Sequence, residues 1–127
     1  MLTPQQRRRF DRILDAVLDE LPDHLHEMLE EVPVVIEDEP SRRLLREMGI
    51  EDDEDLCGLH SGIPLTQRSV EHSGTLPDRM MLFRGPIARV AARNREDLRE
   101  QIRITLLHEI GHHFGLDEED LTELGYG

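Results

Sequence analysis

Hydrophobic positions near the N-terminus recur at intervals of three and four residues. These positions are Phe10, Ile13, Leu14, Val17, Leu18 and Leu21. Because residues at this spacing share one face of a helix, the pattern predicts an amphipathic helix that ends near Leu21. Thr3 followed by Pro4 is typical of its first turn, with the threonine as N-cap. A second, shorter helix is predicted from Asp23 to about Glu30.

The middle of the chain alternates between short hydrophobic runs and turn residues. VPVVIED (32–38) is rich in β-branched residues and predicts a strand. SRRLLREMG (41–49) predicts one or two helical turns that end at its glycine. LCGLHSGIPLTQRS (56–69) is broken by Gly and Pro and predicts a strand or hairpin. RMMLFRGPI (79–87) stops at a Gly-Pro pair, which favours an edge strand.

The C-terminal third predicts a long helix followed by a short one. Asn94 or Asp97 opens the long helix, which carries LLHEIGHHFGLDEED (106–120). Hydrophobic residues surround it nearly completely and predict a central, buried helix: Ile104, Leu106, Leu107, Ile110 and Phe114. A last short helix is predicted from Asp117 to Leu124. The predicted class is therefore α+β, with helices around a small sheet.

Length and charge restrict the possible functions. A chain of 127 residues fits one domain, 1–127, with a modest core that must be aliphatic because aromatic residues make up 3%. The formal net charge of −13 repels phosphate backbones, so we expect no nucleic-acid partner. All 15 basic residues are arginine, which excludes chemistry that depends on a lysine amine.

The single cysteine and the N-terminal sequence further restrict the possible chemistry and location of the protein. Cys57 has no disulfide partner within the chain, and it follows EDDED (51–55), whose charges raise a thiol pKa. We therefore expect a small buried hydrophobic residue rather than a nucleophile. No hydrophobic run resembles a signal peptide or approaches the length of a membrane span, so we expect a soluble, cytoplasmic protein without membrane contacts.

HEIGH at 108–112 is an H-E-x-x-H motif. Residues four apart on a helix lie on one face, so His108 and His112 can present ring nitrogens to one metal ion. Glu109 lies about 100° around the helix from His108, near such an ion but outside this pair. From there its carboxylate can act as general base towards a water that zinc activates. The motif therefore predicts a Zn²⁺ site with Glu109 as the catalytic residue.

A catalytic zinc normally has three protein ligands and one open position. Gly115 is suited to the left-handed turn that ends a helix and would return the chain towards the metal. Asp117 or Glu118 could then supply the third ligand. The alternative for Asp117 is the N-cap of the last helix, with Asp120 three residues on.

The H-E-x-x-H residues could instead form a hydrogen-bonded cluster without metal, and the remaining histidines have structural explanations. His113 is expected to be a core residue or a support for a metal ligand. We expect surface or packing roles for the other four, of which the last two could line a cleft: His24, His26, His60 and His72.

Four segments resemble the mini-zincins, a family of small bacterial zincin-like metallopeptidases. They are VVIEDEP (34–40), LCGLHSGIPLTQRS (56–69), LPDRMMLFRGPI (76–87) and HEIGHHFGLDEEDLTELGY (108–126). The resemblance covers nearly the whole chain. It implies a minimal zincin-like domain in which the motif helix packs under a small sheet. It also implies zinc-dependent peptidase activity, with an edge strand from Met80 to Arg84 that borders the cleft and could pair with an extended peptide.

The sequence departs from the related pattern H-E-x-x-H-x-x-G-x-x-D. Glu118 occupies the last position, with Asp117 one residue earlier, and the register favours Glu118. Metzincins carry a methionine turn beneath the metal, but no methionine follows Met81 here. Tyr126 is a candidate substitute, as a packing residue or a phenol near the site, with a C-terminal tether as the alternative.

The predicted function is a zinc-dependent peptidase that acts on a peptide or a protein. Two alternatives belong to other classes. One is a metal-dependent RNA hydrolase with H-x-x-x-H-x-x-G-x-D-H, against which the acidic surface, Glu109 and Glu118 all count. The other is a non-catalytic protein-binding module with a vestigial metal site. A homodimer is compatible with the modest aliphatic core.

Overall fold

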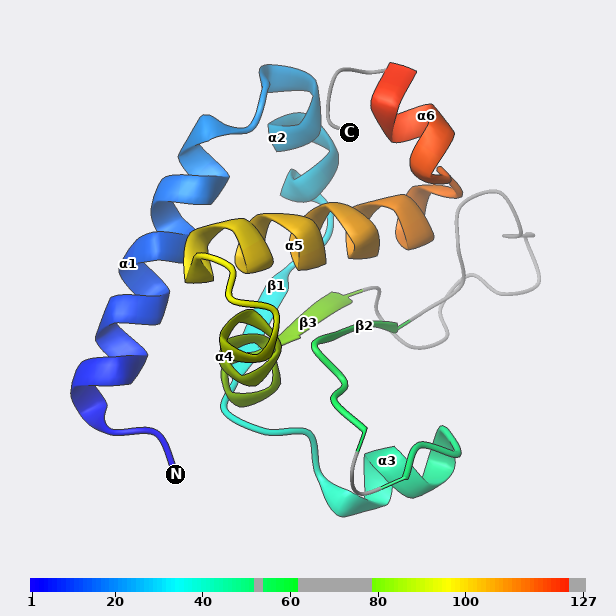
Figure 1. Cartoon of the computed structure of the whole chain (residues 1–127). Helices are drawn as coiled ribbons and strands as arrows, with labels where there is room; N and C mark the ends of the chain where they lie inside the picture. The colour runs from blue at the N-terminus through cyan, green and yellow to red at the C-terminus, as the bar shows by residue number, and fades with distance from the viewer. Residues whose placement is uncertain (52–53, 62–78, 124–127) are drawn as a thin grey trace.

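The computed structural model describes residues 1–51, 54–61 and 79–123 (Figure 1). Within these residues the chain is α+β, with helices around a small mixed sheet, as predicted. Several predictions lie outside the described residues: the second half of the 56–69 segment, His72, Tyr126, and the side chains of His24 and Glu118.

The first two helices follow the predicted boundaries. Helix α1 spans Pro4–Glu20 and α2 spans Asp23–Glu30. The Thr3 hydroxyl oxygen accepts a hydrogen bond from the Gln6 N–H at 3.1 Å, and the Gln6 side chain accepts one from the Thr3 N–H at 2.8 Å. This reciprocal cap satisfies two backbone donors at the helix start. The helix then buries the apolar face that its spacing predicted: Phe10, Leu14 and Val17.

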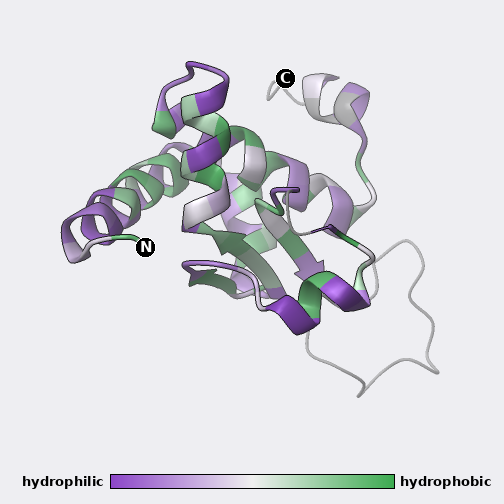
Figure 2. Ribbon diagram, turned by 60° about the horizontal axis from the view of Figure 1, so that its bottom comes forward, coloured by the Kyte–Doolittle hydropathy of each residue, from purple (hydrophilic) through white to green (hydrophobic). Residues whose placement is uncertain are grey.

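The sheet contains β1 (Val34–Glu37), β2 (Gly58–Ser61) and β3 (Arg79–Phe83). Its order is β1-β3-β2, with β1 parallel and β2 antiparallel to β3. The prediction of an edge strand at 79–87 was therefore wrong, because β3 is central among the described strands. Figure 2 shows hydrophobic residues concentrated in this sheet.

The side chains of β3 explain why it is central. Met80 and Leu82 are 0% exposed and Phe83 is 1% exposed, so consecutive residues are buried on both faces of the strand. A strand covered on both faces carries a continuous hydrophobic run instead of an alternating one. The Gly-Pro pair after it belongs to the next element and does not mark a sheet edge.

Helix α4 (Arg84–Arg93) was not predicted. Pro86 lies in its first turn, where the missing N–H is tolerated because donors there have no partner within the helix. Ile87 and Ala91, one turn apart, are buried and attach the helix to the core. The shorter α3 (Arg42–Glu47) was predicted; the Ser41 hydroxyl oxygen caps it by accepting from the Leu44 N–H at 3.0 Å.

Helix α5 (Leu98–Phe114) crosses the sheet and contacts α1, α4, β2 and β3 (Figure 1). It ends as predicted at Gly115, whose φ of 69° is left-handed. The Leu116 N–H then donates to the Gly111 carbonyl at 2.7 Å, and α6 (Glu118–Glu123) follows. The predicted all-round burial of α5 was wrong on one face, where Ile104 is 42% exposed.

An ion-pair network joins α1, the end of β1 and α4. Arg84 donates two hydrogen bonds to Asp11 at 2.9 Å and one to Asp38 at 3.0 Å. Arg7 donates to the other Asp38 oxygen at 2.7 Å. The Arg7 hydrogen bond is the main reason that the pKa of Asp38 lies below its usual value, with Arg84 contributing further. No helix among the described residues is long and apolar enough to cross a membrane.

Candidate metal centre

His108 and His112 lie one turn apart on α5, as the helical repeat requires. Their ring centroids are 4.2 Å apart, and the rings are inclined by 62°. Glu109 lies beside them, and one candidate ligand atom from each of the three residues falls within 4.8 Å of the others. Both histidines are exposed, whereas Glu109 is only 5% exposed. The motif thus presents two accessible imidazoles over a buried carboxylate.

The buried carboxylate of Glu109 has an unusual environment. Burial raises its pKa from the ordinary 4.5 to about 7, because the charged form loses hydration. Among the described residues its Oε2 atom has no hydrogen-bond partner, and His112 Nδ1 lies 4.0 Å from it. A buried carboxylate oxygen in this condition is costly unless a cation or a proton satisfies it.

The two imidazoles are suited to binding a cation. The pKa of His112 is lowered by partial burial and then by the neighbouring His108. The neutral imidazole is the form that binds a metal ion. Two imidazoles beside a carboxylate are a nitrogen and oxygen donor set that zinc accepts. The residues present therefore fit the predicted zinc.

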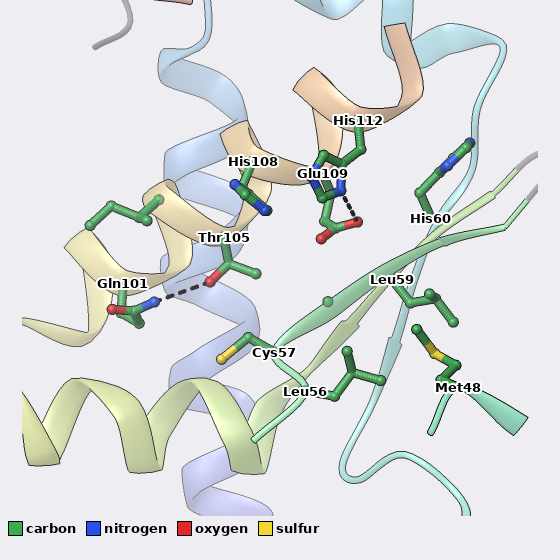
Figure 3. A pocket seen from close by; sticks show the side chains of 12 residues that line it. Met48, Leu56, Cys57, Leu59, His60, Gln101, Thr105, His108, Glu109 and His112 are labelled. Carbon is green, nitrogen blue, oxygen red and sulfur yellow. Dashed lines mark hydrogen bonds and ion pairs between the residues drawn. The ribbon is translucent and has the colours of Figure 1, made fainter. Parts of the chain in front are cut away.

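The three motif residues open into a pocket of about 440 Å³ (Figure 3). One wall is a stripe along α5, and the other comes from the residue after α3, the segment that leads into β2 and β2 itself. The stripe consists of Gln101, Ile104, Thr105, His108, Glu109 and His112. The opposite wall consists of Met48, Leu56, Cys57, Gly58, Leu59 and His60.

Gly58 allows β2 to approach the motif helix closely. A Cβ atom at this position would lie 2.9 Å from Glu109 Cγ and 3.1 Å from Thr105 Cγ2. It would also lie 3.2 Å from the carbonyl oxygen of Met81 on the neighbouring strand. Glycine is therefore required for the present distance between β2 and α5. The strand backbone closes the side of the pocket next to Glu109.

His60 lines the pocket, as one of the two histidines expected to be able to do so. Its ring contacts that of His113 edge to face, with centroids 4.7 Å apart. His113 is 1% exposed and makes a similar contact with Phe114 at 4.5 Å, in agreement with its predicted core position. The sequence spacing could have placed His60 at the pocket, because it lies two residues after Gly58 and alternate residues of a strand share a face.

Cys57 is partly buried in the pocket wall. Burial, and then the charge of Asp55, raises the pKa of its thiol to about 11. Asp55 is itself held by Arg89 and Arg93 of α4, at 2.9 and 3.1 Å. The thiol is therefore protonated at neutral pH, which agrees with the expectation of a non-nucleophilic residue.

The structure places Asp117 in a helix cap. Its Oδ1 atom accepts from the Asp120 N–H at 2.8 Å, and Asp120 Oδ2 accepts from the Asp117 N–H at 3.0 Å. These two bonds cap the last helix, which is the alternative role predicted for Asp117 from its position before that helix. Asp117 is not part of the cluster of His108, Glu109 and His112. The Glu118 side chain lies outside the described residues, so Glu118 as third ligand stays a prediction.

Comparison with known proteins agrees with this geometry. No curated protein matches the chain. The model of a family described as zincin-like metallopeptidase matches residues 29–127, which contain the sheet, the pocket walls and the motif helix. The match covers more than half of the chain and confirms the resemblance noted in its sequence. The chain belongs to the zincin-like metallopeptidase family.

Proposed function

We propose that this protein is a zinc-dependent peptidase that hydrolyses peptide bonds in the pocket between α5 and β2. The observation that carries the proposal is the placement of His108, Glu109 and His112 together at a pocket of about 440 Å³. Membership of a metallopeptidase family supports the same chemistry. His108 and His112 would hold the zinc, with Glu118 as the proposed third ligand.

Zinc, when bound, polarises a carbonyl group and makes a water molecule acidic enough to be deprotonated near neutral pH. The residues of the chain supply the proton transfers. Glu109 is buried beside the imidazoles, and its raised pKa of about 7 makes its carboxylate a stronger base than an exposed one. Glu109 would take a proton from the attacking water and deliver it to the leaving amine.

The walls of the pocket support this role. The backbone of β2 at Gly58 lies against Glu109 and limits the access of bulk water to the carboxylate from that side. Low hydration strengthens electrostatic interactions inside a site. With β3 central in the sheet, β2 is the strand next to the pocket, and we propose that the substrate peptide lies along it.

The described pocket does not favour RNA. Among the residues that line it there is no arginine, and the whole chain carries a formal net charge of −13. Affinity for a phosphate backbone depends largely on lysine or arginine side chains that neutralise its charge. A peptide or protein substrate is the better match to these walls.

Metal content and cleavage test the proposal together. Protein purified without chelator should contain about one zinc per chain by elemental analysis, and His112→Ala should lose it. Zinc-loaded wild type should cleave members of a mixed peptide library, and Glu109→Gln should retain zinc while cleaving none. A wild-type protein that takes up no added zinc would contradict the proposal.

A vestigial site gives a different result. Zinc uptake without cleavage of any library peptide, by wild type and Glu109→Gln alike, would indicate the non-catalytic binding module instead. Glu109→Gln is nearly isosteric, so circular dichroism should show the same fold as wild type. This control separates loss of chemistry from loss of structure.

A further inference from the structure

The pocket has two chemically different walls, and the difference bears on what it binds (Figure 3). Along α5, polar side chains form a continuous stripe from Gln101 through Thr105 to the motif residues. The Gln101 amide nitrogen donates to the Thr105 hydroxyl at 3.3 Å, and both residues are at least nine-tenths buried. Such a wall suits the polar groups of a peptide backbone that lies between it and β2.

The opposite wall is aliphatic. Leu56, Leu59 and Met48 lie across the pocket from the polar stripe. Met48, immediately after α3, is 42% exposed, as is Ile104 on α5, and both line the pocket. They are two of the three large hydrophobic residues that are exposed among the described residues, the other being Met1 at the chain end. Exposed apolar residues gathered in one pocket indicate a binding surface for an apolar group.

The charge of the site excludes one class of side chain. Glu109 is in the pocket, no arginine lines its described part, and the chain carries a formal net charge of −13. An aspartate or glutamate side chain packed on the aliphatic wall would lose hydration, and no arginine of the described lining would pair with it. The aliphatic wall thus favours a large apolar side chain of the substrate, and the charge of the site disfavours an acidic one.

We propose that the pocket is a specificity site for a large aliphatic or thioether side chain, such as leucine or methionine, next to the cleaved peptide bond. This inference rests on the proposed peptidase function and names its substrate class. The peptide backbone runs between the walls, with the scissile carbonyl towards His108 and His112. The selected side chain packs on Met48, Leu56, Leu59 and Ile104. Methionine at the mouth adapts its shape to such side chains.

Two sets of three synthetic peptides, each set varying only one of the two residues that flank the cleaved bond, test the proposal. The cleavage site is first mapped by mass spectrometry with the mixed library, and leucine, glycine or aspartate is then placed on each side of it in turn. Zinc-loaded protein should cleave the leucine peptide on the order of tenfold faster in kcat/KM than the glycine peptide, and the aspartate peptide slowest.

Variants of residues at the mouth of the pocket test which side chains cause the preference for leucine. Met48→Gln and Ile104→Gln change exposed side chains and should leave the fold intact. Each should lower kcat/KM for the leucine peptide several-fold and lower that for the glycine peptide by less, so that the ratio of the two values falls. Arg46→Gln on α3 and Arg103→Gln on α5 are matched controls, because neither residue lines the pocket. A loss with the controls equal to that with the pocket variants would overturn the assignment.

Measurements of peptide binding test the proposed specificity site independently of the proposed peptidase activity. Isothermal titration calorimetry of zinc-loaded Glu109→Gln with library-derived leucine, glycine and aspartate peptides measures the preference without cleavage. Tighter binding of the leucine peptide, weakened by Met48→Gln, would support the pocket even if no peptide were cleaved. Equal binding of the three, or no measurable binding of any, would overturn it. Cleavage without any preference among the peptides would overturn it and leave the peptidase function standing.

Discussion

Gly58 and Glu109 are in contact across the pocket wall: a Cβ atom on Gly58 would lie 2.9 Å from Glu109 Cγ. The strand that closes the pocket therefore also fixes the position of the proposed general base. A methyl group at Gly58 must displace Glu109, Thr105 or the sheet.

We expect Gly58→Ala to lower stability by about 1–3 kcal/mol, the usual cost of overfilling a packed interior. Thermal unfolding measures this as a lower Tm. Because Glu109 Cγ is the atom nearest to the added methyl group, we also expect kcat for peptide cleavage to fall more than the zinc content does.

Thr105→Ser provides the control, since it removes the methyl group that lies 3.1 Å from the added Cβ. The double variant should recover part of the lost Tm. An unchanged Tm and kcat in Gly58→Ala would show that the strand moves freely from the helix, contrary to the close contact described above.

Asp117 and Glu118 are expected to have separate roles. Asp117→Ala removes the cap on the Asp120 N–H and should cost about 0.5–2 kcal/mol, a typical value for a lost N-cap. Its zinc affinity should remain near wild type. Glu118→Ala should weaken zinc binding strongly, as expected for the third ligand. Competition with a chromogenic chelator measures both affinities, and the reverse order would assign the metal to Asp117.

Cys57 should react slowly with thiol reagents in the folded protein. Burial and Asp55 raise its pKa from 9.0 to about 11, so the thiolate fraction at pH 8 falls about 100-fold. The rate of alkylation by iodoacetamide should rise by a similar factor in denaturant. Asp55→Asn should raise the rate in the folded state, because it removes the second cause of the shift. Equal rates in the folded and unfolded protein would contradict this account.

The ion pairs of Asp38 should stabilise the fold in a pH-dependent way. Its pKa is lowered in the folded state, chiefly by the hydrogen bond from Arg7, so its contribution is present above the unfolded value of 3.8. That contribution is lost as the pH falls through the still lower folded pKa. Asp38→Asn should therefore lower stability at pH 7 by about 1 kcal/mol, a modest effect because solvent screens the partly exposed pairs.

Chemical denaturation of wild type and Asp38→Asn from pH 7 to pH 2 measures this effect. The difference between the two proteins should shrink below pH 3.8, as the wild-type carboxyl becomes protonated. A difference that stays constant to pH 2 would show that shape, and not charge, causes the loss.

Local signals in the sequence predicted much of the structure. The Thr3 cap, the left-handed turn at Gly115 and the pairing of His108 with His112 each depend on residues within one or two helical turns. Their geometry follows from the helical repeat and from backbone preferences. The family was also recognised, because the motif and its flanking segments are contiguous in the sequence.

The errors arose where long-range packing decides the outcome. The central position of β3 depends on β1 and β2, which come from distant parts of the chain. Pro86 was taken as the end of a strand, although a proline in the first turn of a helix is equally compatible with the local sequence. The contribution of Met48 to the pocket depends on where α3 lies, and no periodicity in the sequence specifies that.

The parallel pairing of Val34 with Met80 sets the order in which parts of the site can form. His108 and His112 are neighbours as soon as α5 is helical, so two of the proposed metal ligands are in place before the sheet exists. The pocket wall at β2 requires β3, and β3 pairs with a strand more than forty residues earlier in the chain, so this wall depends on slow, non-local contacts. Under the proposed function, metal content therefore reports mainly on α5 and the residues that follow it, whereas peptide selectivity reports on the complete fold.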